Sequence, residues 1–337
     1  MSKDKLYIKR WLDVCCILIF IMILVGGATR LTQSGLSMVD WNPLMGIFPP
    51  LNDKQWSDSF DAYKQYPEYQ KVNQFRNMDI SNYKRIYYWE YAHRMLGRVI
   101  GLTFILPLIY FHRRNFLSSR LKFHMIMATL LVIFQGLLGW FMVKSGLIDN
   151  PHVSHYRLAS HLFLAFILLA YTYCNRLTLN NINNNNKIDK SLFFHIKNLF
   201  ILYIIQVLFG AFIAGTKAGL LWNTFPLMEG QLIPDGLLAL NPFYRNFFEN
   251  MKMFQFVHRL VGTLLVLYSG WFFIKSQKQF YNKYSGLLFM TLMMQFYIGI
   301  MTLILKVPLL FGVLHQGIAA IILLIMVHIL FSMNNSK

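Results

Sequence analysis

Eight apolar stretches, each about 20 residues long, constrain the fold of this chain more than any other feature of the sequence. They cover approximately residues 11–28, 91–110, 121–143, 157–177, 193–214, 254–274, 284–304 and 309–331. A helix rises about 1.5 Å per residue, so each stretch is long enough to cross about 30 Å of hydrocarbon. Backbone polar groups find no water inside a bilayer and must be satisfied within the segment. The sequence therefore predicts an all-α membrane protein with eight transmembrane helices.

The composition supports this class and argues against others. Of the 337 residues, 56% are hydrophobic and only 14% are charged, whereas soluble domains have roughly 25% charged residues. Lys and Arg outnumber Asp and Glu by 32 to 14, an excess that in a soluble chain would suggest nucleic acid binding. Here the basic residues flank the apolar stretches, so we expect a lipid bilayer and no nucleic acid as partner. All three cysteines lie in or beside apolar stretches, so no disulfide is expected: they are Cys15, Cys16 and Cys174.

The placement of Lys and Arg predicts the orientation of the chain. The N-terminal segment and the short segments after the even-numbered stretches are basic with few acids, whereas most acids lie in two long segments, 29–90 and 215–253. Cytoplasmic segments carry the excess of Lys and Arg. Both termini are therefore expected in the cytoplasm and the two long segments outside. No small-residue cleavage site follows the first stretch, which favours a retained helix. No targeting peptide precedes it, which favours a bacterial plasma membrane over an organelle.

The two halves of the chain resemble each other. We interpret the Asn-rich segment 179–190 as a cytoplasmic linker between an N-terminal half, 1–178, and a C-terminal half, 191–337. Matched features occur in the same order in both halves: Trp41-Asn42 with Trp222-Asn223, His93-Arg94 with His258-Arg259, Gln135 and Gly139 with Gln295 and Gly299, and His161 with His315. Each half has an even number of helices, so a duplication gives two tandem four-helix bundles with pseudo-two-fold symmetry.

Four of the ten histidines stand out because they share one side and one depth of the predicted membrane. We expect them in the first turns at the outer ends of the even-numbered helices: His93, His161, His258 and His315. Two imidazoles from facing helices are the usual ligands of a six-coordinate haem iron inside a bundle. The alternative is that these histidines hydrogen-bond between helices. Their occurrence in two matched pairs favours iron ligation, and two histidines alone would leave a zinc shell half empty.

Residues near two of these histidines fit the same interpretation. Gly97 and Gly101 follow His93 on one helix face, and Gly262 follows His258 in the same way, which would leave room for a flat macrocycle. Arg94 and Arg259 come directly after the histidines, where a guanidinium can pair with haem propionates. If the histidines only link helices, the glycines merely allow close packing.

The two halves differ at one chemically important position. Glu90 stands three residues before His93, whereas Gln255 stands three residues before His258. A carboxylate can accept a proton and an amide cannot, so the difference predicts one catalytic half and one accessory half. The alternative role for Glu90 is an ion pair with Arg94, four residues on, and the two roles are compatible.

Taken together, these residues resemble the haem A synthase family over essentially the whole chain. The resemblance rests on Glu90-Tyr91-Ala92-His93-Arg94, on His161, His258-Arg259 and His315, and on the segment from Gly26 to Ser37, continuing to Trp41-Asn42-Pro43 in the form shared by mitochondria and proteobacteria. It implies oxidation of the C8 methyl group of haem O to a formyl group, with water as the oxygen source. It also implies a haem b in the C-terminal half and the substrate haem in the N-terminal half. Some members carry a cysteine pair in the first outer loop, and this chain has none there.

Two other classes of function fit the four histidines. A dihaem electron-transfer protein needs the histidines but not Glu90, and a haem carrier or exporter would bind haem without altering it. As partners of a haem A synthase we expect a haem O synthase, an electron acceptor and a second copy of the chain. The haem sites are expected near the outer face of the membrane.

Overall fold

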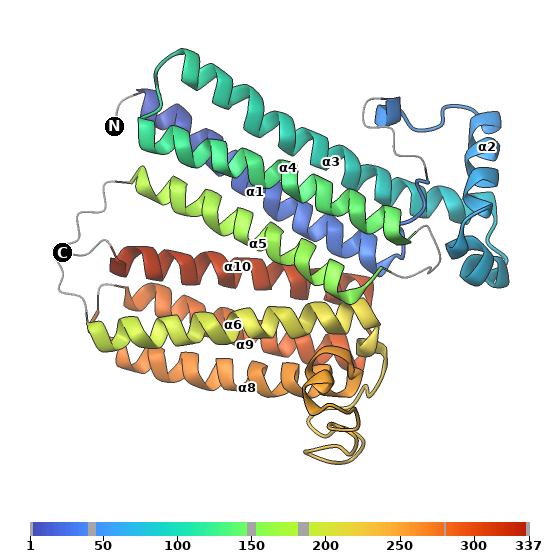
Figure 1. Ribbon diagram of the computed structural model, residues 1–337. Helices are drawn as coiled ribbons and strands as arrows, with labels where there is room; N and C mark the ends of the chain where they lie inside the picture. The colour runs from blue at the N-terminus through green and yellow to red at the C-terminus, as the bar shows by residue number, and fades with distance from the viewer. Residues whose placement is uncertain (1–2, 40–44, 147–152, 181–188, 280, 335–337) are drawn as a thin grey trace. The chain divides into compact units, whose positions relative to one another are not determined.

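The computed structural model describes residues 3–39, 45–146, 153–180, 189–279 and 281–334. Eight long helices account for most of it, and all are long and apolar enough to span a membrane. They are α1 (Lys3–Leu31), α3 (Ile80–Arg113), α4 (Ser119–Gly146), α5 (His155–Thr178), α6 (Lys190–Thr216), α8 (Met251–Lys275), α9 (Asn282–Ile304) and α10 (Leu309–Asn334) (Figure 1). No strand is named in these ranges. The predicted all-α membrane fold with eight spans is confirmed.

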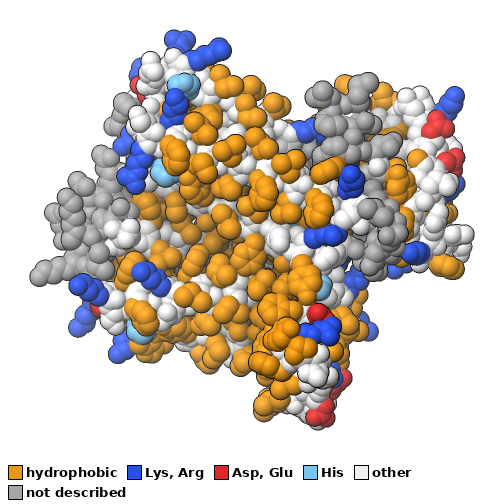
Figure 2. Space-filling model, in the orientation of Figure 1, with side chains coloured by type: hydrophobic (Ala, Val, Ile, Leu, Met, Phe, Trp, Pro, Cys, Tyr) orange, Lys and Arg blue, Asp and Glu red, His pale blue; other side chains and the backbone are white. Residues whose placement is uncertain are grey.

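Shorter elements occupy the two long connections. They are α2 (Asp53–Lys64) and α7 (Asn246–Glu249), the 3₁₀ turns Met45–Ile47, Gln74–Arg76, Ala218–Leu220 and Phe243–Arg245, and a π-helical turn at Tyr69–Asn73. Large apolar side chains are exposed along the long helices. Figure 2 shows these hydrophobic surfaces over the helices, with Lys and Arg gathered towards helix ends and most Asp and Glu on the connecting segments. This distribution is the one expected for helices that contact lipid.

The chain forms two compact units. The N-terminal unit is Val14–Leu168, and the C-terminal unit is Met1–Asp13 together with Leu169–Lys337. Within the C-terminal unit, α6 packs against α8 and α10, and α9 packs against the same two helices, so the four form a closed bundle. Within the N-terminal unit, α3 packs against both α4 and α2. The division into halves at a linker stays a prediction, because residues 181–188 of that linker lie outside the described residues.

The helix α3 begins eleven residues before the apolar stretch that predicts it. Its start is fixed by Asp79, whose side chain accepts a hydrogen bond from the backbone N–H of Asn82 at 2.8 Å. The added turns are amphipathic and bury Tyr83 and Tyr87, so a hydropathy window does not detect them. The expectation that His93 lies in a first turn is therefore wrong, because His93 lies roughly three and a half turns after Ile80. The other three histidines lie in the second or third turn of their helices.

An aromatic cluster joins α2 to the beginning of α3. It consists of Met38, Trp56, Phe60, Tyr63, Tyr83, Ile86 and Tyr87. The ring of Tyr83 stacks on those of Phe60 and Tyr63, each with 5.1 Å between ring centres. Tyr63 is fully buried and donates its hydroxyl to Glu68 at 3.0 Å; burial and this carboxylate raise the pKa of Tyr63. The long first connection is thus a folded, packed element.

The second long connection is held by polar contacts. Glu229 accepts hydrogen bonds from Trp222 Nε1 and from Lys252 Nζ, both at 2.7 Å. These two donors lower the pKa of the exposed Glu229 carboxyl group. Asn250 caps α8 by accepting from the backbone N–H of Lys252 at 3.0 Å. Both connections therefore have defined structure beside a helix that carries one of the four histidines.

Candidate haem-binding sites

The four predicted histidines form two pairs, one in each unit. In the C-terminal unit, His258 of α8 and His315 of α10 have ring centres 6.3 Å apart, with the ring planes at 65°. In the N-terminal unit, His93 of α3 lies within electrostatic range of His161 of α5. All four histidines are half-buried. The structure thus brings together the residues paired by sequence spacing.

Each imidazole lies against a glycine of a neighbouring helix. A Cβ atom added at Gly139 of α4 would lie 3.1 Å from Cε1 of His161, and one at Gly299 of α9 would lie 2.8 Å from Cε1 of His315. The equivalent distances are 3.0 Å between Gly210 and Cε1 of His258, and 3.5 Å between Gly26 and Nε2 of His93. Ordinary carbon contacts are longer than most of these. At Gly139, Gly210 and Gly299, therefore, a larger residue would require a shift of the ring, whereas the distance at Gly26 is that of an ordinary contact.

The glycines predicted to leave room for a macrocycle differ in how much space surrounds them. A Cβ at Gly101 would meet nothing within 4 Å, and one at Gly97 would meet only Met22 at an ordinary 3.5 Å. At Gly262, however, the space is filled by the amide of Gln206, whose Nε2 lies 3.1 Å from the added Cβ. The expectation of open space beside Gly262 is therefore wrong in this structure, because a side chain of α6 lies there.

Gln206 also contacts His258 directly. Its backbone carbonyl lies 3.1 Å from Nδ1 of His258, and its side-chain Nε2 lies 3.2 Å from Nε2 of the same ring. A carbonyl acceptor on Nδ1 fixes the proton there and leaves Nε2 as the free lone pair of the imidazole. Metal ligation through Nε2 would then require the Gln206 amide to give up its contact with the ring.

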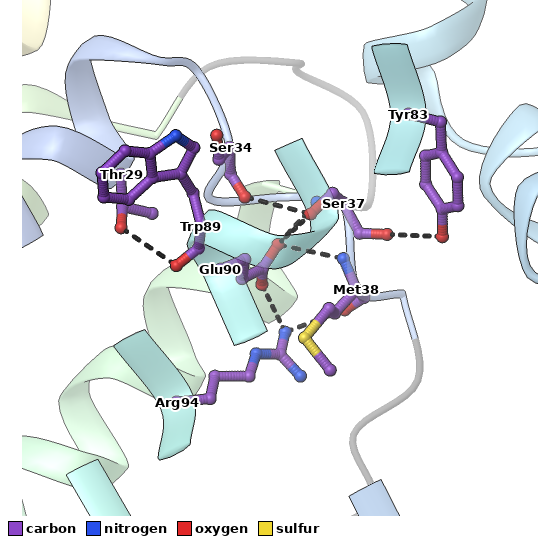
Figure 3. Close-up of polar contacts among 8 residues, drawn as sticks. All are labelled: Thr29, Ser34, Ser37, Met38, Tyr83, Trp89, Glu90 and Arg94. Atoms are coloured by element: carbon purple, nitrogen blue, oxygen red, sulfur yellow. Dashed lines mark hydrogen bonds and ion pairs between the residues drawn. The ribbon is translucent and has the colours of Figure 1, made fainter. Parts of the chain in front are cut away.

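Glu90 lies at the centre of a buried hydrogen-bond network in the N-terminal unit (Figure 3). Its Oε2 accepts from the backbone N–H and the hydroxyl of Ser37, both at 2.7 Å, and from the backbone N–H of Met38 at 2.9 Å. Its Oε1 accepts from Arg94 Nη2 at 2.6 Å. Only 2% of Glu90 is exposed. The predicted ion pair with Arg94 is present, and three further donors hold the other oxygen.

Gln255 is the equivalent residue of the C-terminal unit. Its side chain donates to the backbone where Glu90 accepts from it. Its Nε2 donates to the backbone carbonyls of Ala218 at 2.8 Å and Leu221 at 2.6 Å, and its Oε1 accepts from Arg259 at 2.6 Å. Ala218 and Leu221 occupy the places that Ser34 and Ser37 have in the first repeat. The segment after α1 presents N–H groups and the segment after α6 presents carbonyl groups. Glutamate and glutamine therefore each match the backbone they face.

The two arginines tie these segments to their helices. Arg94 Nη2 donates to the carbonyl of Met38 at 2.8 Å as well as to Glu90. Arg259 donates to the carbonyls of Trp222 at 2.7 Å and Thr224 at 2.8 Å as well as to Gln255. The buried Nε of Arg259 has no partner among the described residues. Both guanidiniums thus lie near the paired histidines and already bind loop carbonyls.

The first long connection reaches this network through the aromatic cluster. The hydroxyl of Tyr83 donates to the carbonyl of Ser37 at 3.2 Å and bonds with the hydroxyl of Ser59 at 2.7 Å. Tyr83 is buried among the rings of α2. Helix α2 therefore helps to fix the segment that surrounds Glu90. Residues Trp41, Asn42 and Pro43 of the predicted motif lie outside the described residues.

Sequence reasoning missed several residues that shape these sites. Ser37 and Met38 hold Glu90, Gly26 and Gly210 lie against histidine rings, and Gln206 touches His258. Two signals were available: the match of Gln135 and Gly139 with Gln295 and Gly299, on the helices that face the second histidine of each pair, and the segment from Gly26 to Ser37, to which no individual roles were assigned. Within the described ranges, no group of three or more His, Cys, Asp or Glu side chains could hold a metal ion, so each site offers two imidazoles.

The separation of the C-terminal rings is compatible with iron ligation by both, once the Gln206 amide leaves Nε2 of His258. A metal midway between ring centres that are 6.3 Å apart would lie about 3 Å from each, as bonds of about 2 Å to the near ring nitrogens require. The backbone carbonyl that accepts the Nδ1 proton of His258 also fits a haem iron ligated by this residue. So do the glycines that lie against both rings. In the N-terminal unit, Gly139 lies equally close to His161, whereas Gly26 is at an ordinary contact distance from His93.

The fold and the two sites define a polytopic membrane protein that carries a pair of histidines in each of two helical units. Residues 9–327 match the family described as cytochrome oxidase assembly protein, and the chain belongs to that family.

Curated relatives named haem A synthase align with nearly the whole chain. That of Nitrosospira multiformis is 46% identical over 318 residues, covering 91% of this chain and 88% of the relative. That of Nitrosomonas eutropha is 42% identical over 330 residues, covering 95% and 92%. That of Ehrlichia canis is 41% identical over 326 residues, covering 96% and 92%. The resemblance found in the sequence is confirmed.

Proposed function

We propose that this protein is a haem A synthase, which oxidises the C8 methyl group of haem O to a formyl group and so supplies haem A for terminal oxidase assembly. The observation that supports this most strongly is the similarity to haem A synthases over nearly the whole chain, combined with the two histidine pairs. With water as oxygen source, a methyl group and one water give a formyl group, four protons and four electrons. The protein must therefore bind the haem, admit water, receive protons and pass electrons to an acceptor.

The two units take different parts in this proposal. His258 and His315 would hold a resident haem b, which supplies one-electron redox chemistry when bound. His93 and His161 would hold the substrate haem O. Arg259 and Arg94 would bind the haem propionates, to which the unpartnered Nε of Arg259 offers one further donor.

Glu90 is the proposed proton acceptor. It belongs to the same helix as His93 and is the buried carboxylate of that unit that lies one turn from a histidine. Four donors hold its carboxylate in one position, one turn from His93. Gln255 cannot take up a proton, which supports assigning the chemistry to the N-terminal unit.

Purified protein with added haem O and ferricyanide as electron acceptor tests the reaction itself. We expect haem A to form with four equivalents of ferricyanide reduced for each formyl group. Reduction of ferricyanide with no change in the mass of the haem would favour the alternative of a dihaem electron-transfer protein. Haem bound and released with neither change would favour a carrier.

The glycines against the histidine rings allow a stringent test with a matched control. Gly139→Ala places a Cβ 3.1 Å from His161, whereas Gly136, one turn earlier on α4, has nothing within 4 Å of such an atom. Overpacking costs about 1–3 kcal/mol, so Gly139→Ala is expected to weaken binding of haem O about tenfold or more. Gly136→Ala should leave it unchanged. Equal affinities in titrations of the two variants would contradict the assignment of His161.

The orientation in the membrane is part of the proposal. We infer that the protein lies in a bacterial plasma membrane with both termini in the cytoplasm and with the histidine sites near the outer face. The excess of Lys and Arg in the predicted inner segments supports this. Expected partners are a haem O synthase, an electron acceptor and a second copy of the chain.

Reporter fusions check this orientation. A reporter fused after Arg113, at the end of α3, is expected to give a cytoplasmic signal. A reporter fused near Asn223, after α6, is expected to give an external signal. A cytoplasmic signal from the second fusion would overturn both the topology and the placement of the sites.

A further inference from the structure

The hydroxyl of Tyr83 binds one end of a peptide group whose other end binds Glu90. This peptide group joins Ser37 to Met38, so its carbonyl belongs to Ser37 and its N–H to Met38. Tyr83 donates to the carbonyl at 3.2 Å, and the N–H donates to Oε2 of Glu90 at 2.9 Å (Figure 3). Because a peptide group is planar and rigid, a bond that fixes the carbonyl also fixes the direction of the N–H.

The direction of the backbone at this place differs between the two units. At Glu90 it presents N–H groups, whereas at Gln255 it presents the carbonyls of Ala218 and Leu221. A side chain that binds the Ser37 carbonyl favours the direction that a carboxylate needs. Hydrogen bonds in a chain also polarise one another, so a donor on the carbonyl strengthens the bond made by the N–H of the same peptide group.

Tyr83 is itself held by helix α2. Its side chain is fully buried, and its ring stacks on the rings of Phe60 and Tyr63, each with 5.1 Å between ring centres. Its hydroxyl lies 2.7 Å from the hydroxyl of Ser59. A phenol can accept one hydrogen bond while it donates another, so Ser59 can donate to Tyr83 while Tyr83 donates to Ser37. The position of the Tyr83 hydroxyl is thus determined by the first long connection.

The other half of the chain has no hydroxyl at the corresponding place in the sequence. Tyr83 stands seven residues before Glu90, and Phe248 stands seven residues before Gln255. Tyrosine therefore occurs with the carboxylate and phenylalanine with the amide. This difference accompanies the one between Glu90 and Gln255, as expected if the hydroxyl serves the carboxylate.

We propose that Tyr83 is a positioning residue, whose hydroxyl orients and polarises the Ser37–Met38 peptide group so that the N–H of Met38 holds Glu90. This inference rests on the proposed function for its effect on haem A formation. It connects the folded first connection to the proposed proton acceptor through a single hydroxyl group.

The infrared carboxylate band of Glu90 reports this hydrogen bond directly. The chain has four glutamates, so purified full-length protein whose glutamates carry ¹³C in the side-chain carboxyl group gives few labelled bands. The band missing from Glu90→Gln belongs to Glu90. Tyr83→Phe keeps the stacked ring but removes the donor, and we expect it to shift this band.

A fluorinated tyrosine keeps the test independent of any loss of folding in Tyr83→Phe. 3-Fluorotyrosine at position 83 has nearly the same shape as tyrosine and is a stronger hydrogen-bond donor. We expect it to shift the Glu90 band in the direction opposite to that of Tyr83→Phe. An unshifted band in 3-fluorotyrosine protein, or a shift in the same direction in both proteins, would contradict the proposal.

The kinetics of haem A formation separate this role from a merely structural one. Tyr83→Phe is expected to lower kcat about tenfold, the equivalent of about one hydrogen bond, and to leave KM for haem O unchanged. Tyr63→Phe is the matched control, since Tyr63 is equally buried and stacked but donates its hydroxyl to Glu68, at 3.0 Å. It should change neither kcat nor the Glu90 band. Equal losses of kcat in both variants would show that Tyr83 acts only through the stability of the aromatic cluster.

The two proposals fail in different ways. Absence of haem A formation by the unchanged protein would refute the proposed function, while the band of Glu90 would still test the hydrogen-bond role of Tyr83. Haem A formation by the unchanged protein, with an unshifted Glu90 band in Tyr83→Phe, would refute only the role of Tyr83.

Discussion

Alanine at His258 or at His315 is expected to remove the bis-imidazole absorption of haem b and most of the bound haem. Either change takes away one of two rings whose centres are 6.3 Å apart, and no other imidazole pairs with the remaining one in the described ring contacts. The glycines that lie against these rings have no side chain that could ligate iron in place of the lost imidazole. Absorption spectra of the reduced and oxidised purified variants, with haem quantified per chain, measure the effect.

His328→Ala is the matched control for this experiment. His328 lies on α10 as His315 does, and its Nδ1 lies 3.1 Å from the hydroxyl of Tyr173, away from His258. We expect this variant to keep its haem b and its spectrum. An unchanged spectrum in both His258→Ala and His315→Ala would show that the resident haem is held elsewhere.

Glu90→Gln is expected to lower haem A formation by roughly 10²–10⁴-fold, the usual contribution of a general base. Both haems should remain bound, and haem O or a partly oxidised alcohol should accumulate. The substitution copies the residue of the other unit, but the backbone it meets differs. An amide nitrogen turned towards Ser37 would face N–H groups, and one turned towards Arg94 would face a cation. Haem content must therefore be measured together with activity.

Ser37→Ala shows the effect of losing a hydrogen bond at Glu90 while Glu90 keeps its negative charge. It removes one of the four donors to Glu90 and keeps the carboxylate, the two backbone N–H groups and Arg94. Losing one hydrogen bond to a charged group costs about 1.5–3 kcal/mol, so we expect a folded protein that still forms haem A. Normal haem A formation by Glu90→Gln would leave Glu90 as an ion-pair partner of Arg94 and move the search for the base to the two long connections.

The eight helices and the histidine pairs could be predicted because both depend on local spacing. An apolar run of about 20 residues determines a span without reference to other segments. His93 and His258 share their flanking residues, so comparing the halves was enough to single them out. Helix α2 could not be found in this way, because a short amphipathic helix has no such run.

The contacts of the site depend on how neighbouring helices are aligned, which no hydropathy pattern contains. Gly210 lies against His258 although 48 residues separate them along the chain. The difference between Glu90 and Gln255 was visible in the sequence, but its physical counterpart was not. That counterpart is the direction of the peptide groups at Ser37 and Leu221, which only the folded segments define.

The mass of the haem extracted from membranes that contain this protein tests the central claim most directly. The chain should be expressed together with a haem O synthase in a host that makes no haem A of its own, with the synthase alone as control. We predict a haem with one oxygen more and two hydrogens fewer than haem O, present only when this chain is expressed. Haem O and haem b alone, in membranes that hold the folded protein, would contradict the account.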